Sequence, residues 1–350
     1  MQRSGADLPG WHGIDVNVLA MRIAVLGAGS WGTTVAALTT KRNSVVLWAR
    51  RPEVALEVNE HGTNHAFLPG FSLPEELRAT SDMEEAVADA DLLVVGVPTA
   101  GFRGALVDAS KHVRPWIPVV SLAKGFEEGT LLRMTEVIKE VLPGHPAATL
   151  TGPNIAREIV AGNAAAGVIA TDDLAVAAAL QAVLARGLFR VYTNHDVIGC
   201  ETGGALKNVI AIATGMAQGL SVGDNTRAAV MSRGLAEITR IGVALGGEER
   251  TFAGLAGMGD LIVTCISPHS RNRYVGEELG RGRPIEDILA GMTMVAEGVK
   301  TARTVITLAE RYGIAAPICE AVHAVVTGAS SGVDAYAGLL PRPGHEHEPG

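Results

Sequence analysis

The chain has few aromatic residues, few cysteines and no long apolar run. Of its 350 residues, 4% are aromatic and three are cysteines, Cys200, Cys265 and Cys319. An odd, widely scattered set of cysteines fits buried, reduced thiols in a cytoplasmic protein better than a disulfide framework or a zinc site, so no metal is expected. Because no apolar stretch has the length needed to cross a bilayer, no membrane anchor is expected either.

An excess of positive charge is also absent. The net charge is -8, which gives no reason to expect a nucleic-acid partner and means that any bound anion must be held by local positive groups. The sequence is 47% hydrophobic and 19% charged, as in an ordinary globular protein. A chain of this length exceeds one typical core and therefore predicts two domains.

Two kinds of periodicity divide the chain. From Met21 to about Val191, short β-branched runs alternate with longer amphipathic stretches, which predicts strand-helix units and a largely parallel sheet. The predicted strands are RIAVLG, SVVLWA, LLVVGVP, PVVSLA, ATLTGP and AGVIAT. After Cys200 apolar residues recur at helical spacing, over 206–220, 226–245, 275–290, 298–312 and 317–328. The predicted fold class is α/β, with an N-terminal Rossmann-like doubly wound sheet domain followed by an all-α C-terminal domain.

The predicted boundaries follow from these patterns. The dinucleotide-binding domain is expected over 21–197 and the helical, substrate-binding domain over 198–338, with the boundary placed between 192 and 200. Residues 1–20 and 339–350 are expected to be flexible tails. Met21 opens the first strand so closely that it is expected to be the functional start.

The first predicted strand runs into a Gly-x-Gly-x-x-Gly turn that opens a predicted helix. In this context Gly27 permits the tight turn, Gly29 lets the backbone approach a pyrophosphate, and Gly32 allows close helix-strand packing. The helix N-terminus then faces the anion. The turn therefore predicts a bound dinucleotide.

The end of the second strand is positive. An acidic residue often binds the adenosine ribose of NAD about 20 residues after the turn, but Arg50 and Arg51 stand there. They would suit the 2′-phosphate of NADP, or they are solvated surface arginines. Glu53 keeps NAD open, so the cofactor is NADP or NAD, with NADP favoured.

The helix predicted after Cys200 carries one lysine on a face of small residues. Gly203, Gly204, Lys207 and Ala211 share that face, which admits a ligand closely. A lysine beside a cofactor would be partly desolvated, which lowers its pKa and favours general acid/base catalysis. The alternative is a lysine that extends to solvent. Asn208 adds a neutral hydrogen-bonding group.

Polar residues in three other segments are candidate substrate ligands. Asp260 follows a predicted Gly-rich turn, and Ser270, Arg271, Asn272 and Arg273 cluster before a predicted helix. The cluster has the chemistry of a phosphate clamp, although a capped helix start with surface arginines would look the same. Lys124 and Asn154 follow strands of the first domain and would face the substrate across the domain cleft.

These residues closely resemble those of the bacterial-type NAD(P)-dependent glycerol-3-phosphate dehydrogenases. The resemblance covers about 22–335 and is carried in order by GAGSWGT, VGVPT, AKGFE, GPNIAREI, GALKNVIAIATGMAQGL, NTRAAVMSRGLAE, GLAGMGDLIVTC, SRNRYVG and VAEGVKT. It implies reversible hydride transfer between NAD(P)H and dihydroxyacetone phosphate, which gives sn-glycerol 3-phosphate for phospholipid synthesis. It also implies a cytoplasmic homodimer that associates through the helical domain.

The resemblance assigns roles residue by residue. Lys207 would be the general acid/base. Substrate would be bound by Lys124, Gly152, Asp260, Ser270, Arg271 and Asn272, to which Asn154 is added from its position. The cofactor would contact Gly27, Gly29, Ser30, Trp31, Gly32, Arg50, Arg51, Lys124, Ala156, Arg271, Val295 and Glu297.

Three other functions remain open from the sequence. A related two-domain hydroxy-acid or sugar-acid dehydrogenase would keep the fold but would use a carboxylate clamp instead of the cluster at Ser270–Arg273. A non-catalytic nucleotide-binding regulator would not need Lys207. A methyltransferase would explain the glycine turn but not Arg50 and Arg51.

Overall fold

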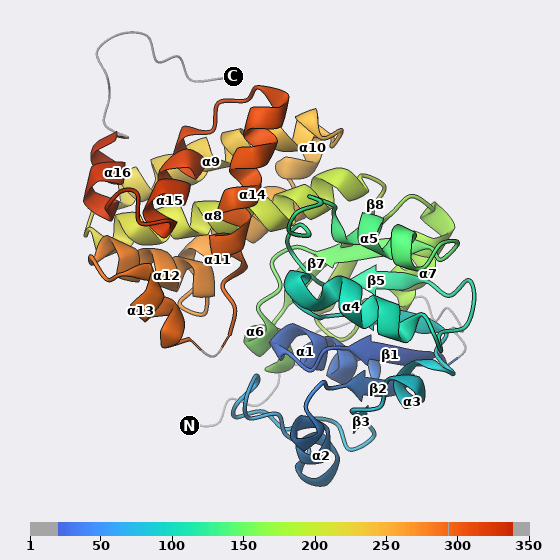
Figure 1. Cartoon of the computed structure of the whole chain (residues 1–350). Coiled ribbons are helices and arrows are strands. Elements are labelled where there is room, and N and C mark those ends of the chain that lie inside the picture. The colour runs from blue at the N-terminus through green and yellow to red at the C-terminus, as the bar shows by residue number, and fades with distance from the viewer. Residues whose placement is uncertain (1–19, 293, 339–350) are drawn as a thin grey trace, which may run out of the picture.

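The computed structural model describes residues 20–292 and 294–338. The tails predicted over 1–20 and 339–350 lie outside these ranges, apart from Ala20. Figure 1 shows a sheet-containing domain, coloured blue to green, beside a helical domain, coloured yellow to red. The predicted class, a sheet domain followed by a helical domain, is confirmed.

The first domain is built on one eight-stranded sheet of order β3-β2-β1-β4-β5-β6-β7-β8. Neighbouring strands are parallel except β6 and β7, so the sheet is largely parallel, as predicted. The sequence did not predict β3 and β8. The strands are β1 Arg22–Leu26, β2 Ser44–Trp48, β3 Arg78–Thr80, β4 Leu92–Val95, β5 Val119–Ser121, β6 Ala147–Thr151, β7 Ala165–Thr171 and β8 Phe189–Asn194.

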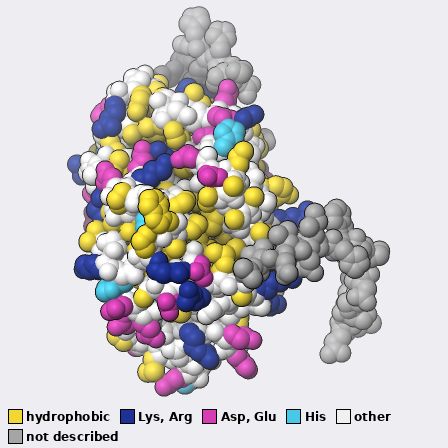
Figure 2. Space-filling view, turned by 90° about the vertical axis from the view of Figure 1, so that its right-hand side faces the viewer, with side chains coloured by type: hydrophobic (Ala, Val, Ile, Leu, Met, Phe, Trp, Pro, Cys, Tyr) yellow, Lys and Arg dark blue, Asp and Glu magenta, His cyan; other side chains and the backbone are white. Residues whose placement is uncertain are grey.

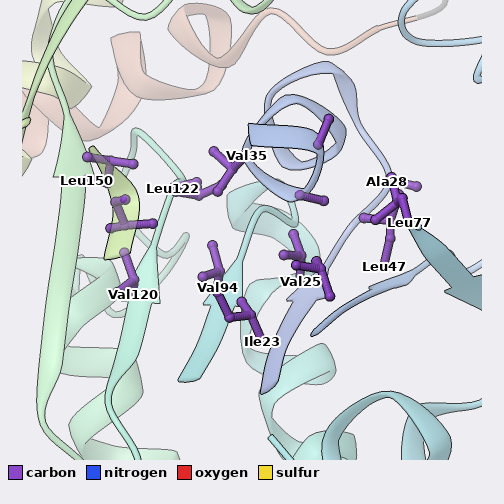
Figure 3. Close-up of a cluster of buried hydrophobic side chains, with 14 of the residues drawn as sticks. Ile23, Val25, Ala28, Val35, Leu47, Leu77, Val94, Val120, Leu122 and Leu150 are labelled. Atoms are coloured by element: carbon purple, nitrogen blue, oxygen red, sulfur yellow. The ribbon is translucent and has the colours of Figure 1, made fainter. Parts of the chain in front are cut away.

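Apolar residues cover both faces of the central strands. Along β1, Ile23 and Val25 belong to one buried cluster, whereas Ala24 and Leu26 belong to another, because successive side chains of a strand point to opposite faces. Figure 3 shows the first cluster, in which Val35 of the first helix lies over the sheet. Burial on both faces explains why these strands appear in the sequence as continuous apolar runs.

Helices cover the sheet. They are α1 Ser30–Thr39, α2 Pro52–His61, α3 Met83–Val87, α4 Thr99–Ala109, α5 Met134–Val141, α6 Ala156–Val160 and α7 Leu174–Leu184. The chain moves from β1 to β2 on one side of the sheet and later to β4 on the other. This reversal, at the carboxyl end of β1, is where open sheets of this kind bind ligands.

The second domain is helical throughout its described part. It contains α8 Val197–Gly219, α9 Asp224–Ala244, α10 Glu249–Phe252, a π-helical turn η1 Leu255–Gly259, α11 Asp260–Ile266, α12 Arg271–Gly280, α13 Ile285–Ala290, α14 Glu297–Tyr312, α15 Pro317–Val326 and α16 Gly332–Gly338. The central helix α8 is almost entirely buried among its neighbours (Figure 1). All three cysteines are buried and free, as predicted.

One local prediction for this domain was wrong. The apolar pattern over 275–290 forms two helices rather than one, because the chain turns at Gly282, with φ +84°, and Pro284 precedes α13. The Gly-rich turn predicted before Asp260 is the π-helical turn η1, which leads directly into α11. Asp260 is therefore held by helical backbone.

The surface carries no extended region of one charge on the face that Figure 2 displays, where apolar side chains gather near the middle and both charge types surround them. Within 20–292 and 294–338, no single helix is both long and apolar enough to cross a bilayer. The bent pair Glu249–Ile266 and Arg271–Gly280 together has the length and composition for such a span, but no other feature of one.

Candidate active site

The glycine turn after β1 leaves space at the start of α1. Gly27 has φ +106°, and a Cβ there would lie 2.9 Å from the carbonyl carbon of Gly96. A Cβ on Gly32 would lie 2.0 Å from the Gly27 oxygen, so close packing requires both glycines. A Cβ on Gly29, in contrast, would meet nothing within 4 Å. The protein does not itself fill the space beside Gly29, and that space fits a pyrophosphate at the helix N-terminus.

The first turn of α1 carries two further predicted cofactor residues. The Ser30 hydroxyl donates to the Phe67 carbonyl at 2.6 Å and lies 3.6 Å from the sulfur of Met294 in the second domain. The Trp31 ring packs edge-on against Phe189, 5.9 Å between centroids. Its Nε1 is buried and has no hydrogen-bond partner among the described residues, so it is a donor available to a ligand.

Arg50 and Arg51 are both exposed at the end of β2 but differ in their contacts. The guanidinium of Arg51 lies over the Phe67 ring, 5.4 Å from its centroid, and its Nε is 3.7 Å from Glu53 Oε1. In the described part of the chain Arg50 makes no ion pair. Arg50 is thus the less constrained of the two positive charges beside the turn.

Lys207, on the central helix α8, is buried. Its Nζ lies 2.5 Å from Asp260 Oδ1, and its side chain is 6% exposed. Burial lowers the Lys207 pKa to about 8, although the attraction of Asp260 opposes the shift. The predicted lowering of the pKa by desolvation therefore agrees with the structure, and the lysine does not extend to solvent.

Lys124 shares the Asp260 carboxylate with Lys207. Its Nζ donates to Asp260 Oδ2 at 2.6 Å and to the Gly152 carbonyl at 2.9 Å. The two lysines come from different domains, and Asp260 is itself almost fully buried. One carboxylate thus holds two ammonium groups, which leaves the cluster with a net positive charge when both lysines are protonated.

Thr264 belongs to this cluster but was not predicted. Its hydroxyl donates to the Asp260 carbonyl at 2.6 Å and accepts from Lys207 Nζ. The signal available in the sequence was its spacing, since a residue four positions after Asp260 lies on the same face of a helix. No helix was predicted to begin at Asp260, so this spacing could not identify Thr264.

A chain of amides links α8 to α12 and α14. Asn272 Nδ2 donates to Asn208 Oδ1 at 2.9 Å, and its Oδ1 accepts from the Gly298 amide at 3.0 Å. Glu297, the first residue of α14, accepts a hydrogen bond of 3.0 Å from Thr99 in the first domain. The structure thus brings Asn272 and Glu297 to the junction of the two domains.

The four donors of the Ser270–Arg273 cluster do not point the same way. Ser270 caps α12 by accepting from the Arg273 amide at 3.2 Å, while Arg271 is exposed and makes no hydrogen bond or ion pair with the residues described. Arg273 is buried and donates to the Ser267 carbonyl and to Glu277, at 2.9 and 2.7 Å. The prediction that all four form one clamp is therefore wrong for Arg273.

Four other predicted positions are Gly152, Asn154, Ala156 and Val295. Gly152 has φ +110° and presents its carbonyl to Lys124. Both polar atoms of the Asn154 side-chain amide are buried without a partner in the described ranges. The hydroxyl of Thr151, which was not predicted as a site residue, is buried without a partner there as well. Ala156 opens α6, and Val295 is 45% exposed. The orphaned polar atoms are suited to contact a bound molecule.

The sequence and fold match proteins of known type. The profile for the N-terminus of NAD-dependent glycerol-3-phosphate dehydrogenase matches residues 22–177, and the profile for its C-terminus matches 196–336. Glycerol-3-phosphate dehydrogenase [NAD(P)+] 2 of Sphingopyxis alaskensis is 57% identical over 333 residues, 95% of this chain and 100% of that protein. Glycerol-3-phosphate dehydrogenase [NAD(P)+] 1 of Mycobacterium tuberculosis is 53% identical over 327 residues, 93% of this chain and 96% of that protein.

A solved structure extends the match to three dimensions. The crystal structure of glycerol-3-phosphate dehydrogenase from Coxiella burnetii superposes with a TM-score of 0.88 at 33% identity, covering 93% of this chain and 100% of that one. Sequence and fold agree over nearly the whole described chain. The chain belongs to the NAD(P)-dependent glycerol-3-phosphate dehydrogenases, oxidoreductases that act on a CH-OH group.

Proposed function

We propose that this enzyme interconverts dihydroxyacetone phosphate and sn-glycerol 3-phosphate, with Lys207 as the general acid/base. The residues of the glycine turn would hold NAD(P), which would supply the hydride in reduction and accept it in oxidation. Lys207 Nζ donates a proton to the C2 oxygen in reduction and accepts it in oxidation. The observation that carries the proposal is a buried ammonium group held 2.5 Å from Asp260, with its pKa lowered to about 8.

The charge of the lysine cluster supports this role. A negative charge develops on the carbonyl oxygen as the hydride arrives, and a fixed ammonium group in a buried site stabilises that charge. Asp260 holds Lys207 in place through Oδ1 and Lys124 through Oδ2. A pKa near 8 keeps Lys207 protonated at neutral pH yet able to release its proton.

The phosphate of the substrate would bind near the start of α12. Arg271 supplies a guanidinium that makes no hydrogen bond or ion pair with the described residues and whose pKa is lowered by burial, against the attraction of Glu297. The α12 amides add positive potential. The proposed substrate ligands are Lys124, Gly152, Asn154, Lys207, Asp260, Ser270, Arg271 and Asn272. The proposed cofactor contacts are Gly27, Gly29, Ser30, Trp31, Gly32, Arg50, Arg51, Lys124, Ala156, Arg271, Val295 and Glu297.

NADP is the proposed preferred cofactor because two exposed arginines follow β2. Arg51 is engaged by Phe67 and Glu53, so Arg50 is the better candidate for the 2′-phosphate. Arg50→Ala should weaken NADPH binding by about 10-fold or more, the value of one charge-assisted contact, and should leave NADH binding within about twofold. Equal losses for both dinucleotides in a fluorescence titration would contradict this preference.

The remaining proposals concern the whole protein. The division at 197/198 follows from the change of sequence pattern, and a cytoplasmic location and a role in phospholipid synthesis follow from the family likeness. The buried free thiols support a reducing compartment. A homodimer through the helical domain is supported by the exposed apolar residues Met258, Ile262 and Ile266, spaced four apart along η1 and α11. Sedimentation tests this proposal: the wild type should sediment as a dimer and Ile262→Asp as a monomer.

The substrate assignment is tested by the loss of nicotinamide absorbance from NADPH, and separately NADH, when dihydroxyacetone phosphate is added. Turnover with this phosphate ester and none with 2-oxo acids is the expected result. Arg271→Ala should raise the KM for dihydroxyacetone phosphate by at least about 10-fold. Turnover of 2-oxo acids instead would favour the hydroxy-acid alternative.

A further inference from the structure

A buried carboxylate near the start of α8 connects the helix that carries Lys207 to the first domain. Glu201 accepts hydrogen bonds from Arg133 Nη1 and the Thr135 amide, each at 2.9 Å, and from the Thr135 hydroxyl at 2.5 Å. Its side chain is 4% exposed. Arg133 and Thr135 lie at the first turn of α5, in the sheet domain. Three donors therefore fix the position of one carboxylate across the junction.

The face of α8 that includes Glu201 continues along the same junction. Gly204 lies so close to the first domain that an added Cβ would be 2.7 Å from the Thr151 hydroxyl. Asn208 Nδ2 lies 3.5 Å from the Lys124 carbonyl. Residues 201, 204 and 208 have the i, i+3, i+7 spacing of one helix face. Lys207 adjoins this face, so the rotation of α8 against the sheet domain sets the direction of its side chain.

Glu201 accepts from the Thr135 amide in the first turn of α5, but Glu136 supplies a second carboxylate to the same terminus. Arg133 is also paired with Glu136, at 2.7 Å, and the Arg133 amide donates to Glu136 Oε2 at 2.8 Å. Burial of an ion pair contributes little net stability, because desolvation offsets the attraction. The main contribution of Glu201 is therefore a fixed contact between α5 and α8, six residues before Lys207.

We propose that Glu201 is a positioning residue, which holds α8 in the rotation that places Lys207 Nζ beside Asp260 and Lys124. The inference rests on the proposed acid/base role of Lys207. Glu201 itself touches neither substrate nor cofactor. It acts by preventing a small rotation or shift of α8, to which a reacting group is sensitive, since a misplacement of about 1 Å can cost about 100-fold in rate.

The test compares Glu201→Ala and Glu201→Gln with a matched control, Glu136→Gln, which alters the other carboxylate on Arg133 without touching α8. Glu201→Ala should lower kcat by about 10- to 100-fold while dinucleotide affinity stays within about twofold. Glu201→Gln keeps an acceptor for Thr135, so its kcat should fall less than that of Glu201→Ala. If the alanine variant does not fold, the glutamine variant provides the test. Glu136→Gln should keep wild-type kcat.

Two readouts separate positioning from stability. In a Lys207→Ala background, Glu201→Ala should cause no further loss of kcat, because the group it positions is gone. Crystal structures of the Glu201 variants should show Lys207 Nζ moved away from Asp260. Wild-type kcat in folded Glu201 variants, or an undiminished loss in the Lys207→Ala background, would overturn the proposal. A wild type silent with dihydroxyacetone phosphate would instead contradict the proposed function, while the position of Lys207 in the crystals would still decide the role of Glu201.

Discussion

The reactivity of single residues is set here by burial and by one shared carboxylate. Desolvation lowers the Lys207 pKa to about 8. The negative charge of Asp260 raises this pKa, and the like charge of Lys124 lowers it. The positions of Lys207 and Lys124 in their predicted elements, together with the family likeness, predict that Lys207, Lys124 and Asp260 belong to one site. They do not predict that Asp260 bridges both lysines, because that contact joins residues 124, 207 and 260, far apart in the chain.

The pH dependence of the reaction follows from the Lys207 pKa. Reduction needs the protonated amine, so kcat/KM for dihydroxyacetone phosphate should fall as pH rises through about 8, whereas kcat/KM for oxidation should rise over the same range. Because Asp260 raises the Lys207 pKa, Asp260→Asn should move both transitions to lower pH, with a lower rate. Steady-state profiles in both directions check this. Transitions that stay in place in Asp260→Asn would contradict the assignment to Lys207.

At the scale of elements, glycines set how closely α8 and α12 approach. An added Cβ on Gly276 of α12 would lie 2.0 Å from the Ile212 carbonyl of α8, and one on Gly215 would lie 2.1 Å from the Arg273 carbonyl. The contacting atoms are backbone, which cannot move without separating the helices. The small residues of α8 therefore serve helix packing at one end and the junction with the sheet domain at the other.

Gly276→Ala should lower the free energy of unfolding by at least about 3 kcal/mol, the upper end of the usual cost of overpacking. The matched control is Gly104→Ala in α4, where an added Cβ meets nothing within 4 Å. That change should stabilise the protein by about 0.5–1 kcal/mol, since alanine loses less backbone entropy in a helix. Denaturant unfolding measures both. Equal stability of the two variants would show that the helices adjust freely.

Local sequence patterns predicted the elements that are long or buried on both faces. They did not predict the short strand β3, the edge strand β8 or the contacts of Arg273. The three-residue strand β3 is too short to show a period. In contrast, β8 alternates buried and exposed residues at the sheet edge, a strand signal that differs from the continuous apolar runs on which the prediction relied. The direction of Arg273 could not be predicted either. Its partner Glu277 lies four residues later in the same helix, but its partner Gln218 comes from α8, and the packing of α8 against α12 is a tertiary contact. The glycine turn was predictable because its chemistry lies within six residues.

At the scale of the whole molecule, the proposed cofactor contacts at the glycine turn can be tested separately from the lysine cluster at the junction of the two domains. A dinucleotide at 100 times its Kd should stabilise the wild type by about 2.7 kcal/mol. Gly29→Ala should fold with unchanged stability, because its Cβ meets nothing within 4 Å, but should lose most of this ligand-dependent shift. Thermal unfolding with and without NADPH measures it. An undiminished shift in Gly29→Ala would place the pyrophosphate elsewhere.

The central claim is that Lys207 transfers the proton, and one measurement tests it most directly: single-turnover oxidation of bound NADPH by dihydroxyacetone phosphate in the wild type, in Lys207→Ala, and in the exposed-lysine control Lys139→Ala. The account predicts a loss of about 100- to 10,000-fold in Lys207→Ala, with NADPH affinity within about twofold and a wild-type rate in the control. A Lys207→Ala variant that transfers hydride at a rate close to that of the wild type would contradict the account.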